Sequence, residues 1–484
     1  MVKRPSPLDV YKYFDKSNCK DCGFDTCMAF ASALLERKVK VTNCSHLLEP
    51  KMKKNLDELI KLIMPPQKPV EFGVGKRMAT IGGEEVLFRH QLTFFNKTAI
   101  AIEVHDEMPD LLETVKYITD IGISRIGERL TVNAVALRCG SGDASKYSEA
   151  AKKVADATDL PIILVSWDAK ILAAGAEAIK DKKPLLYAAT KENWKEVGKT
   201  AGTLKLPLVC FSKDLNELVS LTTSLSKMGV KELCIDPGTV HGEGLQGRTF
   251  DNIWKIRYAA VEAGFPEAGY PIVGVPATIW ADKTADDETN WEIKYSETVM
   301  ATIQMAIDTS LVIMHTGRKP EDIWAVLALM TFRQNVFTDP RIYPRTDAGL
   351  FKVGNPNRMS PVAVTTNYRM TRIPVEEDIK AGNIDAFLLV VDTNGIGVES
   401  AVVGGQFNAS KIAEAIQEYK VFDNVDHRII LIPGMAARYS GALEDEANCY
   451  VCVGPRDSSG IPKWVQEKWT PEAYMEEFNS RQGG

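Results

Sequence analysis

Residues 161–190 read PIILVSWDAKILAAGAEAIKDKKPLLYAAT, and this stretch holds one complete strand–helix–strand unit. Two short apolar runs, PIILVSW and PLLYAAT, are separated by a helical segment. Continuous apolar runs of this length are typical of parallel strands that helices cover on both faces. The stretch therefore predicts an α/β fold that is built from repeats of such a unit.

The same unit recurs along the middle of the chain. Eight strand candidates lie between Thr98 and Thr316, namely AIAIEVH, LTVNAVALR, PIILVSW, PLLYAAT, PLVCFS, ELCIDPG, PIVGVPATIW and LVIMHT. Helical segments such as ASKYSEAAKKVADAT separate them. Eight units in about 220 residues predict a TIM (β/α)8 barrel, with a doubly wound open sheet as the alternative. A hairpin is expected before the barrel, in KRMATIGGEEVLFRHQLTF.

Polar residues follow most of these strands, at the end of a barrel where functional side chains gather. They include His105-Asp106, the segment from Cys139 to Asp143, Trp167-Asp168, Thr190, Ser212, the segment from Asp236 to Thr239, and His315-Thr316. The glycines of RCGSGD could cradle a phosphate, and Asp236 with His241 could form a site. No catalytic motif is present, however. We therefore expect polar ends that do not converge and a barrel that serves as a scaffold.

A separate signal lies near the N-terminus. Cys19, Cys22, Cys27 and Cys44 follow the spacing C-x2-C-x4-C-x16-C. Three crowded ligands with a remote fourth are typical of a cubane iron–sulfur cluster, whereas zinc sites usually show two separate knuckles. Gly23 permits a tight turn, and Asp25 or Thr26 can cap a helix that begins near Cys27. We expect a 4Fe–4S cluster that moves single electrons; zinc and unligated thiols are the alternatives.

Composition excludes several classes of partner. Cys210, Cys234, Cys449 and Cys452 lie in apolar runs, so we expect small buried side chains there. Cys139 is the one remaining cysteine of the nine. The formal net charge of −6 gives no basic field for nucleic acid or anionic lipid. No apolar run reaches about 18 residues, and the first residues lack a signal-peptide core. We expect a cytoplasmic protein without a membrane span.

The last third predicts a Rossmann-like α/β domain. Its strand candidates are VAVTTN, AFLLVVDTNG, VESAVVGG, RIILIPG and YVCVGP, with helices such as NASKIAEAIQEYKV and MAARYSGALEDEA between them. The predicted domains are thus an iron–sulfur domain at 1–62, the barrel at 63–325 and the α/β domain at 326–484. Loops rich in Gly and Thr follow the strands, where open α/β sheets bind ligands. Such loops suit a flat ligand that has amide groups around its edge. The alternative is that these glycines and threonines are ordinary turn residues.

Taken together, the cysteine motif, the barrel and the strings PVAVTTNYRMT, VVDTNGIGVESA, IPGMAARYSGALEDE and VGPRDSSGIP resemble the large (gamma) subunit of the corrinoid iron–sulfur protein of the acetyl-CoA synthase/decarbonylase system. The resemblance covers essentially the whole chain. It implies that the four clustered cysteines ligate a 4Fe–4S cluster and that the C-terminal domain holds a cobamide. The implied cobamide-binding residues are Thr366, Thr371, Thr393, Asn394, Gly395, Ile396, Gly397, Val398, Gly434, Met435, Ala436 and Ala437.

The resemblance also implies a function. The chain would accept a methyl group from a methyl-tetrahydropterin through a methyltransferase, onto Co(I), and deliver it to acetyl-CoA synthase in the CO dehydrogenase complex. It would form a heterodimer with the small (delta) subunit, and the cluster would reduce inactive Co(II). None of the six histidines lies in a D-x-H-x-x-G motif, so the corrinoid is expected base-off, which eases reduction of the cobalt.

Two other functions compete with the methyl carrier. One is an electron-transfer iron–sulfur subunit without a cobamide. The other is a barrel that binds a pterin and itself catalyses methyl transfer, because DPGT at residues 236–239 is similar to a motif of pterin-binding barrels. The expected lack of convergent polar groups argues against the second.

Overall fold

The computed structural model describes residues 5–242, 247–284, 287, 289–339 and 343–482. Contacts divide the chain into two compact units. The first comprises Met1–Ile123 and Leu130–Phe337, and the second comprises Ser124–Arg129 and Thr338–Gly484. The cysteine-rich region and the barrel thus belong to one unit. The predicted boundaries after residues 62 and 325 stay predictions.

The cysteine-rich region is a small helical layer around its own core. Its elements are α1 (Pro7–Tyr11), α2 (Cys27–Leu35), α3 (Lys53–Ile63) and the short 3-10 helices η1 (Val41–Asn43), η2 (His46–Leu48) and η3 (Pro50–Met52). Helix α2 begins at Cys27, as predicted, and Thr26 caps it by accepting the Ala29 N–H at 3.1 Å. Phe14, Phe30 and Leu59 are buried in this core.

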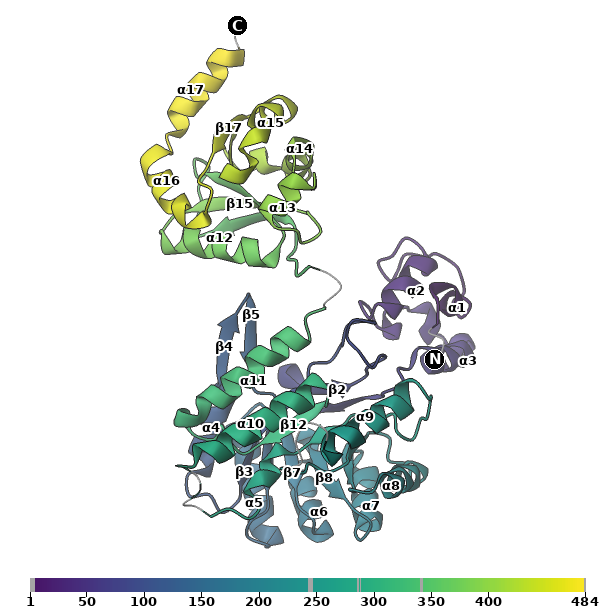
Figure 1. The fold of residues 1–484 in the computed structure, drawn as a ribbon. Coiled ribbons are helices and arrows are strands. Elements are labelled where there is room, and N and C mark those ends of the chain that lie inside the picture. The colour runs from purple at the N-terminus through teal and green to yellow at the C-terminus, as the bar shows by residue number, and fades with distance from the viewer. Residues whose placement is uncertain (1–4, 243–246, 285–286, 288, 340–342, 483–484) are drawn as a thin grey trace. The chain divides into compact units, whose positions relative to one another are not determined.

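Eight parallel strands form a nearly closed barrel (Figure 1). They are β3 (Ala99–His105), β6 (Ala134–Arg138), β7 (Ile162–Val165), β8 (Leu185–Ala189), β9 (Leu208–Phe211), β10 (Leu233–Asp236), β11 (Val273–Gly274) and β12 (Leu311–Met314). Their order is β10-β9-β8-β7-β6-β3-β12-β11. A single parallel bridge between Ile235 and Ile272 links the two ends of the sheet. All eight predicted strands are confirmed, and the open-sheet alternative is wrong.

Helices surround this barrel and cover the outer faces of its strands (Figure 1). They are α4 (Leu111–Asp120), α5 (Ala144–Ala157), α6 (Ala169–Ala178), α7 (Trp194–Leu204), α8 (Leu215–Lys227), α9 (Arg248–Val261), α10 (Trp291–Ala306) and α11 (Ile323–Val336). Side chains alternate along each strand, as the pleat requires. In β3, for example, Ile100 and Ile102 pack outward against the helices, while Ala99 and Ala101 belong to the interior core. Both faces of the barrel sheet are therefore buried away from solvent, which explains why the strands are continuous apolar runs.

The hairpin lies earlier than predicted. Strand β1 (Pro69–Phe72) pairs antiparallel with β2 (Ala79–Gly82), and the segment that follows Gly82 is irregular up to β3. Val70, Phe72 and Ile81 join the barrel's interior core, so the hairpin plugs the barrel. A second hairpin, β4 (Gly122–Arg125) with β5 (Glu128–Thr131), lies between α4 and β6.

The C-terminal sheet has five strands in the order β13-β15-β14-β16-β17. Its elements are β13 (Gly349–Val353), β14 (Val362–Thr366), β15 (Ala386–Val391), β16 (Ile429–Ile432), β17 (Tyr450–Val453), α12 (Arg369–Ala381), α13 (Val398–Val403), α14 (Ala409–Glu418), α15 (Ser440–Ala447), α16 (Ile461–Lys468) and α17 (Pro471–Gln482). Strand β13 is antiparallel to β15 and the other neighbours are parallel, so the sheet is mixed. Cys449 and Cys452 are buried in different cores, which confirms the prediction of small buried side chains at both positions.

One predicted strand in this domain is wrong. VESAVVGG forms helix α13, because Val398, Ala401 and Val402 recur at helical spacing and are buried together in the same core. In chain order the four parallel strands then lie 2-1-3-4, the flavodoxin-type order, which reverses between β14 and β16. A reversal of this kind opens a crevice at the carboxyl ends of the two strands.

Candidate functional site

The four clustered cysteines line one small hollow in the N-terminal layer. Cys19, Cys22, Cys27 and Cys44 contribute to its wall together with Phe24 and Phe30 among other residues. Cys19 is exposed, Cys22 and Cys27 are half-buried, and Cys44 is buried. The arrangement brings cysteines that are up to 25 residues apart in the chain, from 19 to 44, into the wall of the same hollow. The donor set is all sulfur, which suits iron–sulfur clusters and zinc.

The loop that carries the first cysteines has an unusual backbone. Lys16, Asn18, Lys20 and Gly23 all have positive φ. Each non-glycine residue in this region costs about 1 kcal/mol, and such loops persist where their surroundings hold them. Inside the chain, the Asn18 side-chain oxygen accepts the Cys27 N–H at 2.8 Å. Ligation of thiolates by a cluster would supply further restraint, so these residues fit the group.

His46 also lines the hollow, and both of its ring nitrogens lie near carboxylates. Its Nδ1 lies 2.5 Å from Asp15 Oδ2, and its Nε2 lies 3.5 Å from Asp21. A hydrogen bond from the Ser17 N–H, offset in part by burial, and the contacts with Ser17 and His46 lower the pKa of Asp15. Ligand atoms of Cys19, Asp21 and His46 also lie within 4.8 Å of one another. Two of those three are exposed, whereas the four-cysteine set includes the buried Cys44.

A second candidate site lies in the C-terminal sheet, at the crevice between β14 and β16. It is a cavity of about 410 Å³, within the ordinary range for ligand pockets. Its walls come from β14, β16, α12, α13 and the loop that follows β17. Residues of the lining include Thr365, Met370, Thr371, Pro374, Gly397, Val398, Glu399, Ser400, Pro433, Met435, Gly454, Arg456, Asp457 and Ser458.

The predicted cobamide residues divide into two groups around this cavity. Thr371, Gly397, Val398 and Met435 line it. The remaining eight do not line the cavity: Thr366 ends β14, Thr393, Asn394, Gly395 and Ile396 lie in the loop after β15, and Gly434, Ala436 and Ala437 lie in a 3-10 helix, Gly434–Tyr439, after β16. Arg456, Asp457 and Ser458 were missed as site residues, although they follow a predicted strand directly, which is the signal that would have found them.

Asn367 organises the loop after β15 and was also missed. Its side-chain oxygen accepts the N–H of Thr393 at 3.0 Å and that of Gly395 at 2.9 Å, and its amide donates to Asp392 at 2.8 Å. Gly395 has φ +76, and a Cβ there would lie 2.9 Å from the carbonyl oxygen of Tyr343. Asn367 thus fixes the shape of the predicted 393–398 segment from the neighbouring strand.

Two hydroxyls at the end of β14 have no partner among the described residues. Oγ1 of Thr365 and Oγ1 of Thr366 are buried and make no hydrogen bond there. Buried polar atoms are normally paired, and one without a partner calls for an explanation. Thr365 lines the cavity, so a ligand with amide groups could satisfy it. The described lining contains no histidine, and His427 is buried elsewhere with its Nε2 3.0 Å from the Ser360 carbonyl.

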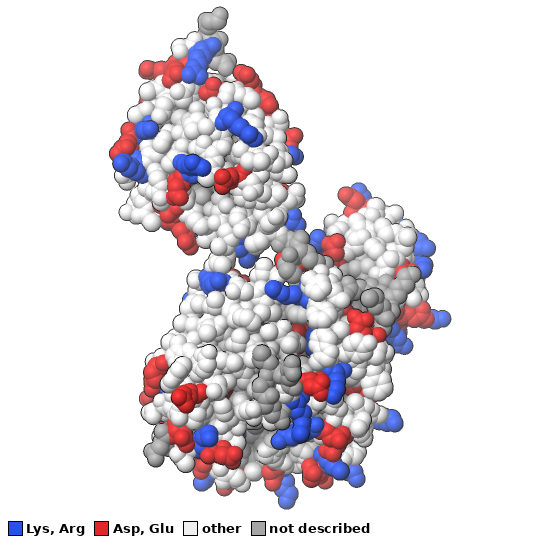
Figure 2. Space-filling model, in the orientation of Figure 1, with Lys and Arg blue, Asp and Glu red and all other residues white. Residues whose placement is uncertain are grey.

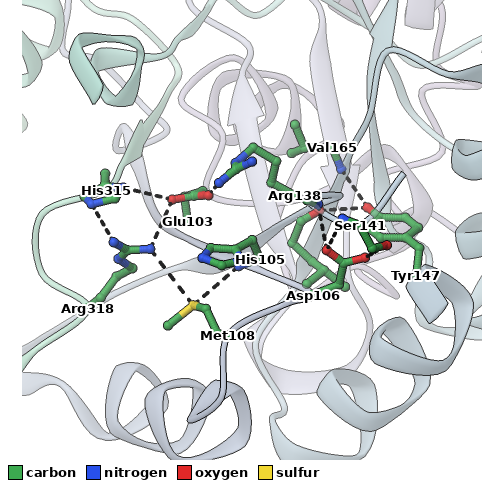
Figure 3. Close-up of polar contacts among 12 residues, drawn as sticks. Glu103, His105, Asp106, Met108, Arg138, Ser141, Tyr147, Val165, His315 and Arg318 are labelled. Atoms are coloured by element: carbon green, nitrogen blue, oxygen red, sulfur yellow. Dashed lines mark hydrogen bonds and ion pairs between the residues drawn. The ribbon is translucent and has the colours of Figure 1, made fainter. Parts of the chain in front are cut away.

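The prediction that the barrel's polar ends do not converge is wrong, because His105 and His315 line the same cavity at the C-terminal mouth and lie beside a cluster of charged side chains (Figure 3). Glu103 lies at the centre, with Arg138 Nε 2.7 Å and His315 Nδ1 3.2 Å from its two oxygens. Arg318 contacts both Glu103 and His315. The prediction failed because Glu103 and Arg138 lie within apolar strand runs, and Arg318 lies beyond the strand end.

Two smaller expectations for the barrel also need correction. The glycine-rich RCGSGD loop binds a carboxylate of the chain itself: Asp106 Oδ1 accepts the N–H of Gly140 at 2.6 Å and that of Ser141 at 3.2 Å. It is therefore not preformed for phosphate. Asp236 and His241 have separate partners, since Asp236 accepts from Tyr187 Oη at 2.7 Å and His241 Nε2 lies 3.0 Å from the Pro276 carbonyl.

Acidic and basic side chains are interspersed over the face shown in Figure 2. Among the helices that the structure describes, none has both the length and the apolar character that a bilayer crossing requires.

Comparison with known proteins extends over nearly the whole chain. A family model described as CO dehydrogenase/acetyl-CoA synthase delta subunit matches residues 69–465. The gamma 1 subunit of the acetyl-CoA decarbonylase/synthase complex of Methanosarcina mazei is 41% identical over 97% of this chain and 100% of its own length. The corresponding gamma subunit of Archaeoglobus fulgidus is also 41% identical, over the same shares of the two chains.

The chain belongs to the acetyl-CoA decarbonylase/synthase gamma-subunit family. Another member of this family, the gamma subunit of Methanothermobacter thermautotrophicus, is 38% identical over 95% of this chain. A second family model, described as a putative Fe-S cluster, matches residues 15–46, which include all four clustered cysteines. The resemblance read from the sequence is therefore confirmed, and the gamma-subunit chain carries an iron–sulfur motif in its N-terminal layer.

Two solved structures align with about half of this gamma-subunit chain. Dihydropteroate synthase from Xanthomonas albilineans, in complex with 7,8-dihydropteroate, aligns over 50% of the chain and 94% of its own length, with 14% identity and a TM-score of 0.35. The enzyme from Thermus thermophilus aligns over 50% of the chain and 92% of its own length, with 11% identity and a TM-score of 0.35.

Proposed function

We propose that this gamma subunit is a corrinoid methyl carrier that includes its own reductive activator. In this proposal the C-terminal sheet holds a base-off cobamide and the four cysteines hold a 4Fe–4S cluster. The methyl group comes from a methyl-tetrahydropterin through a methyltransferase and goes to acetyl-CoA synthase. The observation that carries the proposal is the cavity at the β14/β16 reversal, which has unpaired buried hydroxyls and no histidine in its described lining.

The residues of the C-terminal unit would bind and orient the cofactor. When bound, the cobamide supplies a cobalt centre that can take up and release a methyl group. Thr365 offers a hydroxyl that lacks a partner among the described residues, and Gly397 lets backbone approach closely because it has no side chain. Met370, Pro374 and Met435 provide apolar contact. The lack of a histidine ligand in this described lining favours reduction of the cobalt, because no strong axial donor opposes it.

The size of the cavity supports a shared site. About 410 Å³ suits a drug-sized ligand, whereas a corrin with its peripheral amides is larger. This unit would therefore cover only part of the macrocycle, and the small subunit of the heterodimer would cover the rest. On the same chain, Cys19, Cys22, Cys27 and Cys44 would hold the cluster that returns oxidised cobalt to its active state.

The test is a metal analysis of the protein purified without oxygen together with its small subunit. About four iron and one cobalt per chain are expected, with a Co(II) resonance that lacks nitrogen splitting from an axial base. Ser400, which is exposed on α13 and lines the cavity, provides a blocking variant. Ser400→Trp should lose cobalt and retain iron, while Ser410→Trp, on the exposed side of α14, should retain both.

Other outcomes would separate the alternatives. Iron without cobalt in the wild-type complex would leave an electron-transfer subunit. Zinc in place of iron would contradict the cluster assignment. Equal loss of cobalt in both tryptophan variants would contradict the location of the cobamide.

A further inference from the structure

We propose that the C-terminal mouth of the barrel is a second binding site, for a small molecule that carries a flat aromatic ring and a carboxylate. The Arg138 guanidinium would bind the carboxylate, and the exposed indole of Trp167 would contact the ring. This site is distinct from the cysteine hollow and from the cavity of the C-terminal sheet, and it goes beyond the methyl-carrier function.

The mouth is a cavity of a size that small ligands use. It measures about 840 Å³, within the range typical of small-molecule sites. It lies at the carboxyl ends of the parallel strands, where barrels place their ligands. One part of its wall is charged or polar, formed by Glu103, His105, Arg138, His315 and Arg318. Much of the rest is apolar, including Val165, Ile171, Tyr187, Val275, Trp280 and Ile313.

Arg138 is held in a position to bind an anion. Its Nε donates to Glu103 Oε1 at 2.7 Å, and among the described residues this carboxylate is the only side-chain partner of the guanidinium. The two terminal nitrogens are therefore available, and the side chain is 47% exposed toward the cavity that it lines. A guanidinium whose plane is fixed in this way presents two parallel N–H groups, which match the two oxygens of a carboxylate.

The Glu103 carboxylate holds the charged side chains of the cavity wall together. Its own charge is already balanced by those side chains, so no cationic ligand is required. Burial would raise the pKa of Glu103, but the hydrogen bond to His315 and the charges of Arg138 and Arg318 outweigh burial and hold this pKa at about 2. The carboxylate is therefore ionised and already surrounded by donors (Figure 3). A cationic ligand would have to displace these donors, whereas an anionic ligand can add to the open side of Arg138.

The aromatic residues provide a surface for a flat ring. Trp280 stacks on His315, with ring centroids 4.4 Å apart and planes at 18°. Trp167 is 55% exposed and is supported from within the chain by Phe211 at 5.0 Å and Tyr187 at 5.7 Å. An indole that is supported on one side and exposed on the other is available for stacking. Nδ1 of His105 is buried and finds no partner within the described ranges, which marks a missing hydrogen bond at the same cavity.

The test uses 2-naphthoate as the probe in titration calorimetry with the full cofactor-loaded protein. 2-Naphthamide provides the neutral isostere, and cyclohexanecarboxylate provides the anion without an aromatic ring. Wild-type protein should bind 2-naphthoate at least about tenfold more tightly than either comparison compound. Failure of 2-naphthoate to bind, or equal binding of the acid and the amide, would overturn the proposal.

Variants locate the binding. Arg138→Gln should weaken 2-naphthoate binding about tenfold or more, and Arg138→Lys should weaken it less, because the charge remains but the paired donors are lost. Trp167→Ala should also weaken it, whereas Lys153→Gln, on the exposed side of α5, should leave it unchanged. Unchanged melting temperature and metal content would show that the variants are folded. Binding that survives both Arg138→Gln and Trp167→Ala would place the ligand elsewhere and overturn the proposal.

Discussion

Asn367 shows how one side chain can set the geometry of a candidate binding loop. It pairs with the backbone of Thr393 and Gly395 and with the Asp392 carboxylate. Both of these N–H bonds are buried, and leaving buried donors without a partner costs about 1–3 kcal/mol each. The residue is itself buried, so solvent cannot replace the lost contacts.

Replacement of Asn367 should therefore affect stability and cobamide binding together. Asn367→Ala is expected to destabilise the C-terminal unit by about 2–4 kcal/mol and to lower cobalt content, as measured by denaturant unfolding and metal analysis. The control is Asn408→Ala, which removes the N-cap of α14 and should cost about 1 kcal/mol without affecting cobalt. Equal effects of the two variants on cobalt would contradict the role assigned to Asn367.

Replacement of Thr365 should raise the stability of the cofactor-free protein, in contrast to replacement of Asn367. Its buried hydroxyl has no partner in the described part of the chain, so Thr365→Val removes an unsatisfied group while preserving shape. The cofactor-free protein should become more stable by about 1 kcal/mol, and cobamide affinity should fall. Thermal unfolding without cobamide and cobalt retention after gel filtration measure the two effects. A variant that is less stable without cobamide would indicate that the hydroxyl is satisfied in the free protein.

The cysteine hollow leads to a third prediction at this scale. Cys27→Ser should lower bound iron and the visible absorption of the cluster, because serine oxygen is a poor replacement for thiolate at iron. Cys139→Ser is the matched control, since Cys139 is also partly exposed but lies in the barrel, outside the hollow. Loss of iron from the Cys139 variant alone would contradict the assignment.

At the scale of the elements, the irregular segment between β2 and β3 is held in place by hydrogen bonds to one buried carboxyl group, that of Glu84. Glu84 accepts the N–H groups of Phe95 and Asn96 at 2.8–2.9 Å, and it is only 1% exposed. Burial and the nearby Asp308 carboxylate raise the pKa of Glu84 to about 8. Between pH 4.5 and about pH 8, the Glu84 carboxyl group therefore keeps its proton in the folded protein, whereas the same group has lost its proton in the unfolded chain.

The sign of the resulting pH dependence follows from linkage. Between about pH 4.5 and 8 the folded state binds more protons at this site, so Glu84 lowers the stability of the fold as pH rises, by at most about 1.4 kcal/mol per pH unit. Glu84→Gln keeps a hydrogen-bond acceptor but has no group that titrates. The decrease in stability with rising pH should therefore become smaller in this variant. Urea unfolding across this range measures it, with Glu149→Gln on α5 as the control. An unchanged slope in Glu84→Gln would contradict the prediction.

The elements also show why sequence reasoning succeeded in one domain and failed in parts of another. Barrel strands are buried on both faces, so each is a continuous apolar run that leaves a clear signal. Residues 398–403 contain three valines and one alanine, which suit a strand by composition, but their burial follows helical spacing. Strand β13 was missed because it is a short edge strand with mixed burial. The convergence of Glu103, Arg138 and Arg318 was missed because it depends on strand order: β3 lies between β6 and β12 in the sheet, which brings the ends of these three strands together.

At the scale of the whole molecule, the two compact units have separate hydrophobic cores. Leu164 is fully buried in β7 within the barrel's core, and Leu389 is fully buried in β15 within the core of the C-terminal sheet. Units with independent cores commonly unfold in separate transitions. Calorimetry of the cofactor-free protein should therefore resolve at least two transitions.

Matched leucine variants assign these transitions. Leu164→Ala and Leu389→Ala remove the same group from each core and should each cost about 2–5 kcal/mol, but each should lower a different transition. Adding cobamide to the wild-type protein should raise only the transition that Leu389→Ala lowers, because a ligand stabilises the unit that binds it. If both variants lowered the same transition, the two cores would unfold as one cooperative system. If cobamide instead raised the transition that Leu164→Ala lowers, the barrel and not the C-terminal sheet would hold the cofactor.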